Sequence, residues 1–564
     1  MKTWLKILCP LLLVAAMIYA GRQWSGGELR RAVEQTRREL RQQGFKTELT
    51  DFNFTLPADI SARANTIVSA SQSLQSLRYV HNLEPMEAVG TNVALAMSPM
   101  ALVETSVSAY DPSRTTNLWP LLRAELNNYT EALDHVCATL LAGPVKFQPN
   151  IKTNGGILLP YLAGQRSLAT TLAAQAVLDM HEQNTNGMVT NLLGLSRLVT
   201  AWSPEPVEIS HLVRFACASV ALGAIWESMQ TDLWQDEQLV RLQREWESAQ
   251  FFDGLPETAE LSGASMVTMC QAARAESYWA NFGGWANLLQ EVRNSPSSGF
   301  RSLWWVIQGV RTQANYRHRG GYEDERALLL YFRDRREEFT QAASASTWAE
   351  MRFLPGATNM QVFQGDQASR IGVMMNLKHL AFGSQSSGRT LIARAAETEA
   401  RRRLIVTAIA LERFALKHKT YPQSLAEVVP AFLPAVPLDF IDGKELRYQR
   451  FADGRYLLYS VGLDGVDNGG QMKALEQFNS HHPPRVGGLA PPHQDTDLVW
   501  PLRATQADVD LYDQQQEERA KRFPNWYPPP TPLPEAEARA FRERYVREQW
   551  PANDAAPPVS VEKP

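Results

Sequence analysis

The fold is decided late in the chain, by a stretch that reads RRRLIVTAIALERFALKHKTYP (401–422), LRYQRFADGRYLLYSV (446–461) and GLDGVDNGG (462–470). In the first part, apolar side chains recur on one broad stripe at helical spacing, and Tyr421-Pro422 ends the helix because proline cannot continue it. The second part alternates like two strands around Asp453-Gly454, a dipeptide typical of a tight hairpin. The stretch therefore predicts a long helix, a β-hairpin and a loop rich in Asp and Gly, in that order.

Most of the chain before this stretch reads as helical hairpins. From Asn117 to Phe251 the apolar residues recur at helical spacing, and short polar turns such as Asn184-Thr185-Asn186-Gly187 separate the helices. The pattern resembles a degenerate helical repeat of the tetratricopeptide kind, without a strict period. We therefore expect a mainly α protein, with a helical-hairpin, repeat-like body and a small C-terminal α+β module.

Shifts in composition divide the chain into five predicted parts. They are an N-terminal membrane anchor (1–24), a juxtamembrane helix and linker (25–58), the helical body (59–390), the α+β module (391–502) and a Pro-rich, charged tail (503–564). More than one domain is expected at this length, since domains usually hold ~100–200 residues.

Residues 401–500 resemble the periplasmic domain of the major pseudopilins of type II secretion. That family shows a helix ending in Tyr-Pro, a Pro-Asp stretch, a strand that contains Tyr, and a Ser-x-Gly-x-Asp-Gly loop. The matching residues here are Ala410-Leu411, Phe414, Leu416, Tyr421-Pro422, Leu433, Pro437-Leu438-Asp439, Tyr448 and Tyr459-Ser460-Val461-Gly462-Leu463-Asp464-Gly465. The resemblance covers under a fifth of the chain. With its helical middle, the whole chain is similar to large membrane-anchored bacterial proteins that end in such a module.

The resemblance implies a calcium site, because the late loop of pseudopilins holds Ca²⁺. A hard cation needs several oxygen ligands, and the positions that match in kind are Asp464, Asp467, Asp495 and Asp497. Residues 471–494 are inserted between the two pairs, and Val466 stands where the calcium loop of an EF-hand would have Asp or Asn. A metal-free Asp-Gly turn is the alternative interpretation.

The apolar segment Ile7–Ala20 is interpreted as a signal peptide or a signal anchor. It carries no charge and follows Lys2 and Lys6, and Ile18-Tyr19-Ala20 is a poor cleavage site, which favours an uncleaved anchor. The arginines that follow would pull the chain towards the cytoplasm by the positive-inside rule. They alternate with glutamates, however, and the likeness of the late module to an exported one favours a single-pass inner-membrane protein whose bulk faces the periplasm.

Composition and motifs exclude several function classes. A formal net charge of −4 gives no electrostatic case for nucleic acid. The four cysteines form no CxxC pair, and the common nucleotide, zinc-protease and serine-hydrolase signatures do not occur. His181 beside Asp179 is interpreted as part of a solvated helix end, and His211 as a core histidine. Arg317 belongs to a basic loop that could hold an anion or a lipid head group, or could be plain surface.

Three functions are compatible with these features. The sequence favours a non-enzymatic, membrane-anchored envelope protein, an interaction scaffold whose helical body contacts partner proteins. The alternatives are a component associated with the secretion machinery, or an enzyme of unrecognised class that uses dispersed residues such as His181, His211 or Arg317.

Overall fold

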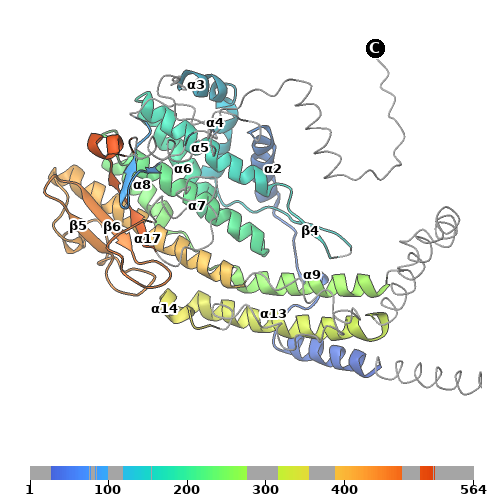
Figure 1. The fold of residues 1–564 in the computed structure, drawn as a ribbon. Helices are drawn as coiled ribbons and strands as arrows, with labels where there is room; N and C mark the ends of the chain where they lie inside the picture. The colour runs from blue at the N-terminus through green and yellow to red at the C-terminus, as the bar shows by residue number, and fades with distance from the viewer. Residues whose placement is uncertain are drawn as a thin grey trace, which may run out of the picture. The chain divides into compact units, whose positions relative to one another are not determined.

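A computed structural model of the chain describes residues 27–74, 77, 80, 83, 86–98, 119–153, 155–275, 316–354, 388–472, 496–511 and 514. The protein is mainly helical, with small sheets, as expected (Figure 1). The predicted anchor, the Pro-rich part of the tail and Asp495 lie outside the described residues. Contacts divide the chain into two units, and residues 1–101 and 119–504 form the first. In the second unit the described residues are Thr505–Leu511 and Gln514, where the Asp508 carboxylate accepts a hydrogen bond from the Thr505 backbone amide at 2.8 Å.

Helices α5 (Leu162–His181), α6 (Thr185–Thr200) and α7 (Glu208–Ser228) form the centre of the body, and their facing side chains are almost fully buried. Of the described helices, α7 is the one long and apolar enough to cross a membrane, yet 72% of its apolar window is buried, so it packs as a core helix here. The elements around this centre are α2 (Ala58–Ser73), α3 (Trp119–Asn127), α4 (Thr130–Leu141) and α8 (Asp236–Glu247). The short turn η1 (Leu49–Asp51) and the turn of the strand pair β3 (Asn150–Ile151) and β4 (Ile157–Leu158) contact residues 255–275.

A long antiparallel helix pair lies beside this centre. Helix α9 (Leu255–Ala275) and helix α13 (Gly321–Ser344) run in opposite directions, since Arg274 pairs with Glu325 at 2.6 Å whereas Glu260 pairs with Arg336 at 2.7 Å. A five-residue π-helical turn, η5 (Tyr316–Gly320), leads into α13. The helix formed by residues 27–42 lies along α13 (Figure 1).

The C-terminal stretch folds as its local sequence predicts. Helix α17 (Gly388–His418) is followed by the short turn η6 (Leu425–Val428) and by the strands β5 (Arg447–Arg450), β6 (Tyr456–Ser460) and β7 (Leu498–Trp500). The strands form an antiparallel sheet in the order β5-β6-β7. The predicted hairpin at Asp453-Gly454 is confirmed, because Arg450 pairs with Tyr456 and Gly454 takes the positive φ of 88° that the turn requires.

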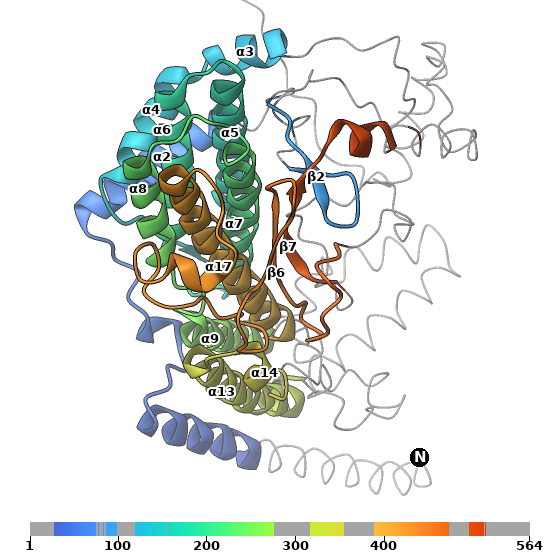
Figure 2. The ribbon, with the colours of Figure 1, turned by 90° about the vertical axis from the view of Figure 1, so that its left-hand side faces the viewer.

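This module shares a core with the helical body. Helix α17 lies between the body helices and the strands β6 and β7 (Figure 2). After Pro501 the chain continues into β8 (Leu502–Arg503), which pairs in parallel with β2 (Val93–Leu95), the partner of β1 (Glu87–Ala88). The buried Trp226 of α7 donates its indole N–H to the Pro501 carbonyl oxygen at 2.9 Å. Body and module are therefore joined by side-chain packing and by a strand pair that spans some four hundred positions of the sequence.

The corner between α5 and α6 corrects one expectation. The sequence suggested a solvated helix end, but Asp179 is only 4% exposed. Its carboxylate accepts hydrogen bonds from the side-chain amides of Asn184 at 2.8 Å and Asn191 at 2.9 Å. Burial raises the pKa of Asp179 to about 6, although these hydrogen bonds act in the opposite direction. A Cβ at Gly187 would lie 2.7 Å from the Asp179 carboxylate, so a larger residue there would have to displace this buried side chain.

Replacing Asp179 by alanine tests this corner. We expect Asp179→Ala to lower the free energy of unfolding by ~1–3 kcal/mol, because it leaves the amides of Asn184 and Asn191 without their acceptor. The measurement is chemical denaturation of both proteins. Asp134→Ala, on the exposed face of α4, is the matched control and should change stability little. Equal effects of the two substitutions would show that the buried corner contributes nothing particular.

Candidate functional site

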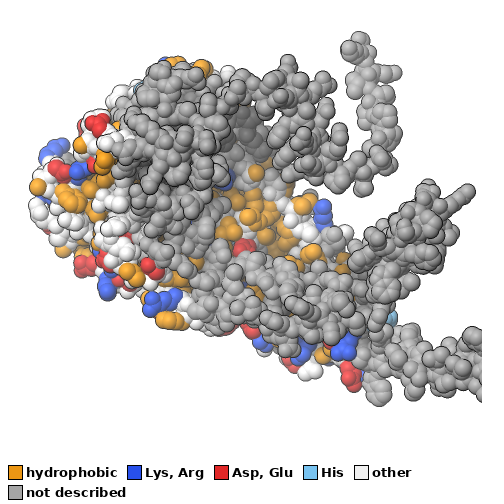
Figure 3. Space-filling view, viewed as in Figure 1, with side chains coloured by type: hydrophobic (Ala, Val, Ile, Leu, Met, Phe, Trp, Pro, Cys, Tyr) orange, Lys and Arg blue, Asp and Glu red, His pale blue; other side chains and the backbone are white. Residues whose placement is uncertain are grey.

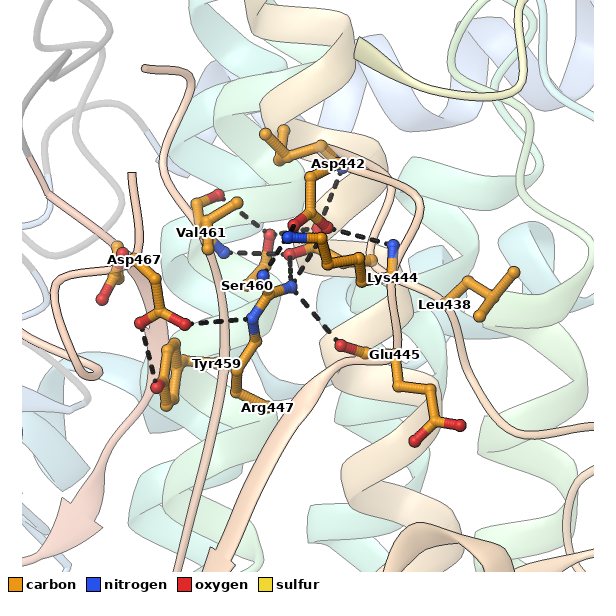
Figure 4. Close-up of polar contacts among 12 residues, drawn as sticks. Leu438, Asp442, Lys444, Glu445, Arg447, Tyr459, Ser460, Val461 and Asp467 are labelled. Atoms are coloured by element: carbon orange, nitrogen blue, oxygen red, sulfur yellow. Dashed lines mark hydrogen bonds and ion pairs between the residues drawn. The ribbon is translucent and has the colours of Figure 1, made fainter. Parts of the chain in front are cut away.

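The candidate site lies at one edge of the β5-β6-β7 sheet, where two loops meet. Residue Arg447, which opens β5, pairs with Tyr459 near the end of β6, so the loop before β5 and the loop after β6 emerge side by side. The first loop carries Asp439 and Asp442, and the second carries the Asp- and Gly-rich sequence that suggested a metal site. Figure 4 shows the polar side chains that these two loops bring together.

Asp439 is the buried centre of the site. It is 0% exposed, and its carboxylate accepts hydrogen bonds from the Ser460 hydroxyl at 2.6 Å and from the backbone amides of Ile441 and Val461 at 2.8 and 2.9 Å. Burial raises its pKa in spite of these donors. Asp439 therefore ties the end of β6 to the loop that precedes β5.

Arg447 connects three carboxylates. Its guanidinium lies 3.0 Å from Asp439, 2.6 Å from Asp442 and 3.3 Å from Asp467, measured from nitrogen to oxygen (Figure 4). Its hydrogen bond to Asp442 is the main cause that raises the pKa of Arg447. Burial acts to raise the pKa of Asp442, but the hydrogen bonds from Arg447 and from the Lys444 amide, together with the charges of both side chains, hold that pKa below its usual value. The two loops are thus joined through one guanidinium.

Asp464, Asp467 and Asp497, the predicted calcium residues that the structure describes, have different hydrogen-bond partners. Asp464 accepts from the Val466 amide at 3.1 Å, in a turn that includes Gly465 with φ of 74°. Asp467 accepts from the Tyr459 hydroxyl at 3.1 Å, as well as from Arg447 and from the backbone.

Asp497, 4% exposed, accepts from the backbone amides of Asn468 at 3.1 Å and Gly470 at 2.7 Å. Asp495 lies outside the described residues. Within the part of the chain that the structure describes, no three His, Cys, Asp or Glu side chains form a group that could hold a metal ion.

Helix α14 (Trp348–Met351), which precedes the module in the sequence, is hydrogen-bonded to both loops. The Trp348 indole N–H donates to the Leu463 carbonyl oxygen at 2.7 Å, and the Trp348 backbone amide donates to the Phe440 carbonyl oxygen at 2.8 Å. The amide of Ala349 continues this pairing with Ile441 at 3.0 Å. No sequence signal near Trp348 pointed to this contact, because its partners lie about a hundred residues further along the chain.

A second polar cluster joins the end of α17 to the hairpin. The Glu412 carboxylate accepts hydrogen bonds from the hydroxyls of Tyr421 at 2.8 Å and Tyr456 at 3.4 Å. The Tyr448 hydroxyl donates to the Pro422 carbonyl oxygen at 2.7 Å. Burial raises the pKa of Glu412 to about 7, opposed by the two tyrosine hydroxyls. The Tyr421-Pro422 motif thus works both as a helix stop and as an anchor for the sheet.

The residues that an enzyme hypothesis would use have separate structural roles. His181 stacks on Trp119 with ring centroids 4.2 Å apart. His211 is fully buried, as expected, with Nε2 3.2 Å from the Thr258 hydroxyl, and burial lowers its pKa to about 3. Arg317 donates to the Arg274 carbonyl oxygen at 3.1 Å.

The three described cysteines, Cys137, Cys217 and Cys270, are also buried, and burial raises the pKa of each thiol to about 12. Such thiols remain protonated near neutral pH and are poor nucleophiles.

Comparison of the chain with protein-family models, with curated proteins and with solved structures finds no significant match.

The Glu412 cluster predicts a pH dependence of stability. The folded-state pKa of about 7 lies above the ordinary value of 4.5, so between these values the folded state holds a proton that the unfolded state has released. The contribution of Glu412 to the free energy of unfolding is therefore full below its unfolded pKa and is lost as the pH rises through its folded pKa. We expect the melting temperature of the wild type, relative to Glu412→Gln, to fall over this range. Glu445→Gln, at an exposed position, is the control. Parallel pH curves for wild type and Glu412→Gln would refute the prediction.

Proposed function

We propose that the chain is a non-enzymatic interaction scaffold of the bacterial envelope. In this proposal Ile7–Ala20 anchors it in the inner membrane, its bulk faces the periplasm, and its C-terminal module is a pseudopilin-like cap. The observation that carries the proposal is the way residues 27–42, the first described segment after the anchor, are attached to the body. A segment that only linked an anchor to a mobile domain would not need buried charges at its contact.

Arg37 and Glu325 form the centre of that attachment. The Arg37 side chain is 10% exposed and that of Glu325 is 1% exposed; the two form an ion pair, and Arg274 of α9 contacts the same Glu325 carboxylate at 2.6 Å. Arg37 also pairs with Glu48 at 3.0 Å. Charges removed from water in this way are tolerated only when they are paired, so a sliding or pivoting motion of this helix would leave unpaired charges in the core. The body is therefore held in a fixed orientation to the segment that leaves the proposed anchor.

The module supports the second half of the proposal. A long helix followed by a three-stranded antiparallel sheet and an Asp/Gly loop is the arrangement that the resemblance to pseudopilins implies. Because α17 is also packed against the body, the module would act as a rigid end of the scaffold and not as a separately moving domain.

The helical body offers surface for protein partners. On the face drawn in Figure 3, apolar side chains gather near the middle of the view. Ile209 at the start of α7 and Leu158 in β4 are 47% and 43% exposed. Apolar surface of this kind is typical of contact sites. The resemblance favours one partner class as the second candidate, the inner-membrane platform of a secretion machine.

The contact of Arg37 and Arg274 with the Glu325 carboxylate, here called the Glu325 clamp, is tested by replacing Glu325 with glutamine. Glu325→Gln leaves Arg37 and Arg274 buried without their shared counter-charge, so we expect the free energy of unfolding to fall by ~3–5 kcal/mol. Limited proteolysis should then cut after residue 42 earlier than in the wild type. Glu323→Gln, in an exposed pair with Arg319, is the matched control and should have little effect. Unchanged stability and cleavage in Glu325→Gln would remove the structural basis of the proposal.

Membrane topology is tested with a reporter fused after Pro564. A reporter active only in the periplasm should give signal, and the full-length chain should remain in the membrane fraction until detergent is added. A chain that is soluble in the cell interior with its first residues intact would contradict the anchor.

Crosslinking in native membranes then identifies the partners. Capture of secretion-platform proteins would favour the second candidate, and a free monomer after detergent extraction would count against it.

A further inference from the structure

The Asp- and Gly-rich loop already contacts a cation of the chain itself, the guanidinium of Arg447 on β5. We propose that the Arg447 guanidinium is the permanent cation of this loop, in the role that the resemblance to pseudopilins assigns to Ca²⁺, so that the module folds without a bound metal. This inference rests on the pseudopilin likeness of the proposed function and specifies how its cap is held together.

The geometry around Arg447 does what a divalent ion does in a loop site. Asp439 and Asp442 come from the loop before β5, and Asp467 comes from the loop after β6 (Figure 4). One positive group in contact with all three carboxylates holds the two loops together. The guanidinium contacts Asp442 through both terminal nitrogens, at 3.1 and 2.6 Å, and reaches Asp467 through Nε at 3.3 Å. A fixed fork of donors is well suited to carboxylates in several directions.

Apart from the exposed Lys444 ammonium, 3.8 Å from Asp442, the remaining charge of the three carboxylates is stabilised by neutral donors. Asp439 accepts from one hydroxyl and two backbone amides, and Asp442 accepts from the Lys444 backbone amide at 3.1 Å. Asp467 accepts from the Gly469 amide at 2.9 Å and from the Tyr459 hydroxyl. Such hydrogen bonds stabilise the ionised form without any metal.

Several oxygen atoms that a calcium ion could use already accept hydrogen bonds. Asp497 accepts from the amides of Asn468 and Gly470, and these contacts shape the turn that follows Asp467. The carbonyl oxygen of Leu463, next to Asp464, accepts the Trp348 indole N–H. Calcium takes 6–8 oxygen ligands, so binding here would compete with these hydrogen bonds and with the Arg447 ion pairs.

The test is thermal unfolding of the full-length chain in detergent, with millimolar CaCl₂ or with EDTA. For the wild type we expect the same melting temperature in both. Arg447→Met should unfold at a lower temperature in EDTA, because it leaves Asp439 and Asp467 without a cation and leaves Asp442 with only the exposed Lys444 ammonium, 3.8 Å away. In this variant CaCl₂ should restore part of the loss, by more than ~2 °C, which is a readily measured shift.

Two further variants separate charge from geometry. Arg447→Lys keeps a positive charge but loses the fork, so it should melt lower than the wild type and remain insensitive to CaCl₂. Arg455→Met lies on the same hairpin, in a more exposed pair with Asp453, and is the matched control with no expected calcium response.

Each outcome decides the inference. A wild-type melting temperature that rises with CaCl₂, and no longer rises in Asp497→Asn or Asp467→Asn, would overturn it and place Ca²⁺ at the predicted residues. An Arg447→Met variant as stable as the wild type in EDTA would overturn it as well. If Arg447→Met does not fold, the wild type and Arg447→Lys still decide: a calcium response in either one would overturn the proposal. A calcium response leaves the membrane scaffold standing, because topology and the Glu325 clamp are measured independently.

Discussion

The structure depends on the burial of one helix, α17, on more than one side. Its apolar residues do not form a single narrow stripe: Leu404, Ala408 and Leu411 are fully buried, and so are Ile405 and Ile409 on the widened part of the stripe. A helix that is apolar over so wide a face has to be covered by more than one layer. Helices α7 and α8 cover one side and the strands β6 and β7 cover another (Figure 2). The body and the module therefore share a core, and neither can complete its burial without the other.

Charged groups inside this core determine which elements meet. Arg402 of α17 donates to the Trp246 carbonyl oxygen of α8 at 3.2 Å. The Arg37–Glu325 pair and the Arg447 cluster do the same at two other contacts. Burial of a charge is unfavourable unless its partner is in place, so each pair penalises the alternative arrangements more strongly than it stabilises the native one. In this interpretation the burial of apolar side chains supplies most of the stability, and the buried ion pairs select which elements pack against each other.

Local patterns predicted the elements well, and distant contacts explain where prediction stopped. The end of α17 at His418, shortly before Tyr421-Pro422, and the hairpin at Asp453-Gly454 follow from proline sterics and turn chemistry, which act within a few residues. The pairing of β2 with β8 and the seat of Trp348 on the Asp/Gly loop depend on segments far apart in the chain, and no periodicity encodes them.

The candidate site shows the same limit. Resemblance directed attention to Asp464, Asp467, Asp495 and Asp497, which are carboxylates within or near one loop. The side chain that organises the site is Arg447, on the neighbouring strand, and the most buried carboxylate is Asp439, in the loop before it. A sequence pattern shows which anions lie together along the chain but not which cation the fold brings to them. Asp179 was misjudged for the same reason, because its hydrogen-bond partner Asn191 lies on the next helix, 12 residues further along the chain.

A cation supplied by a side chain differs from a bound metal in what it couples to folding. A metal site forms only when free ion is present, so the stability of the loop follows the ion concentration of the compartment. Arg447 is part of β5, so its positive charge is always present when the strand is. The register of the hairpin places this charge next to Asp439, Asp442 and Asp467 when β5 and β6 pair. In this proposal the loop closes when β5 and β6 pair in the correct register, whatever the ion concentration. For a module whose helix is also part of the core of the body, the proposed role of Arg447 would make the loop, the sheet and α17 one cooperative structure whose stability does not follow the ion concentration.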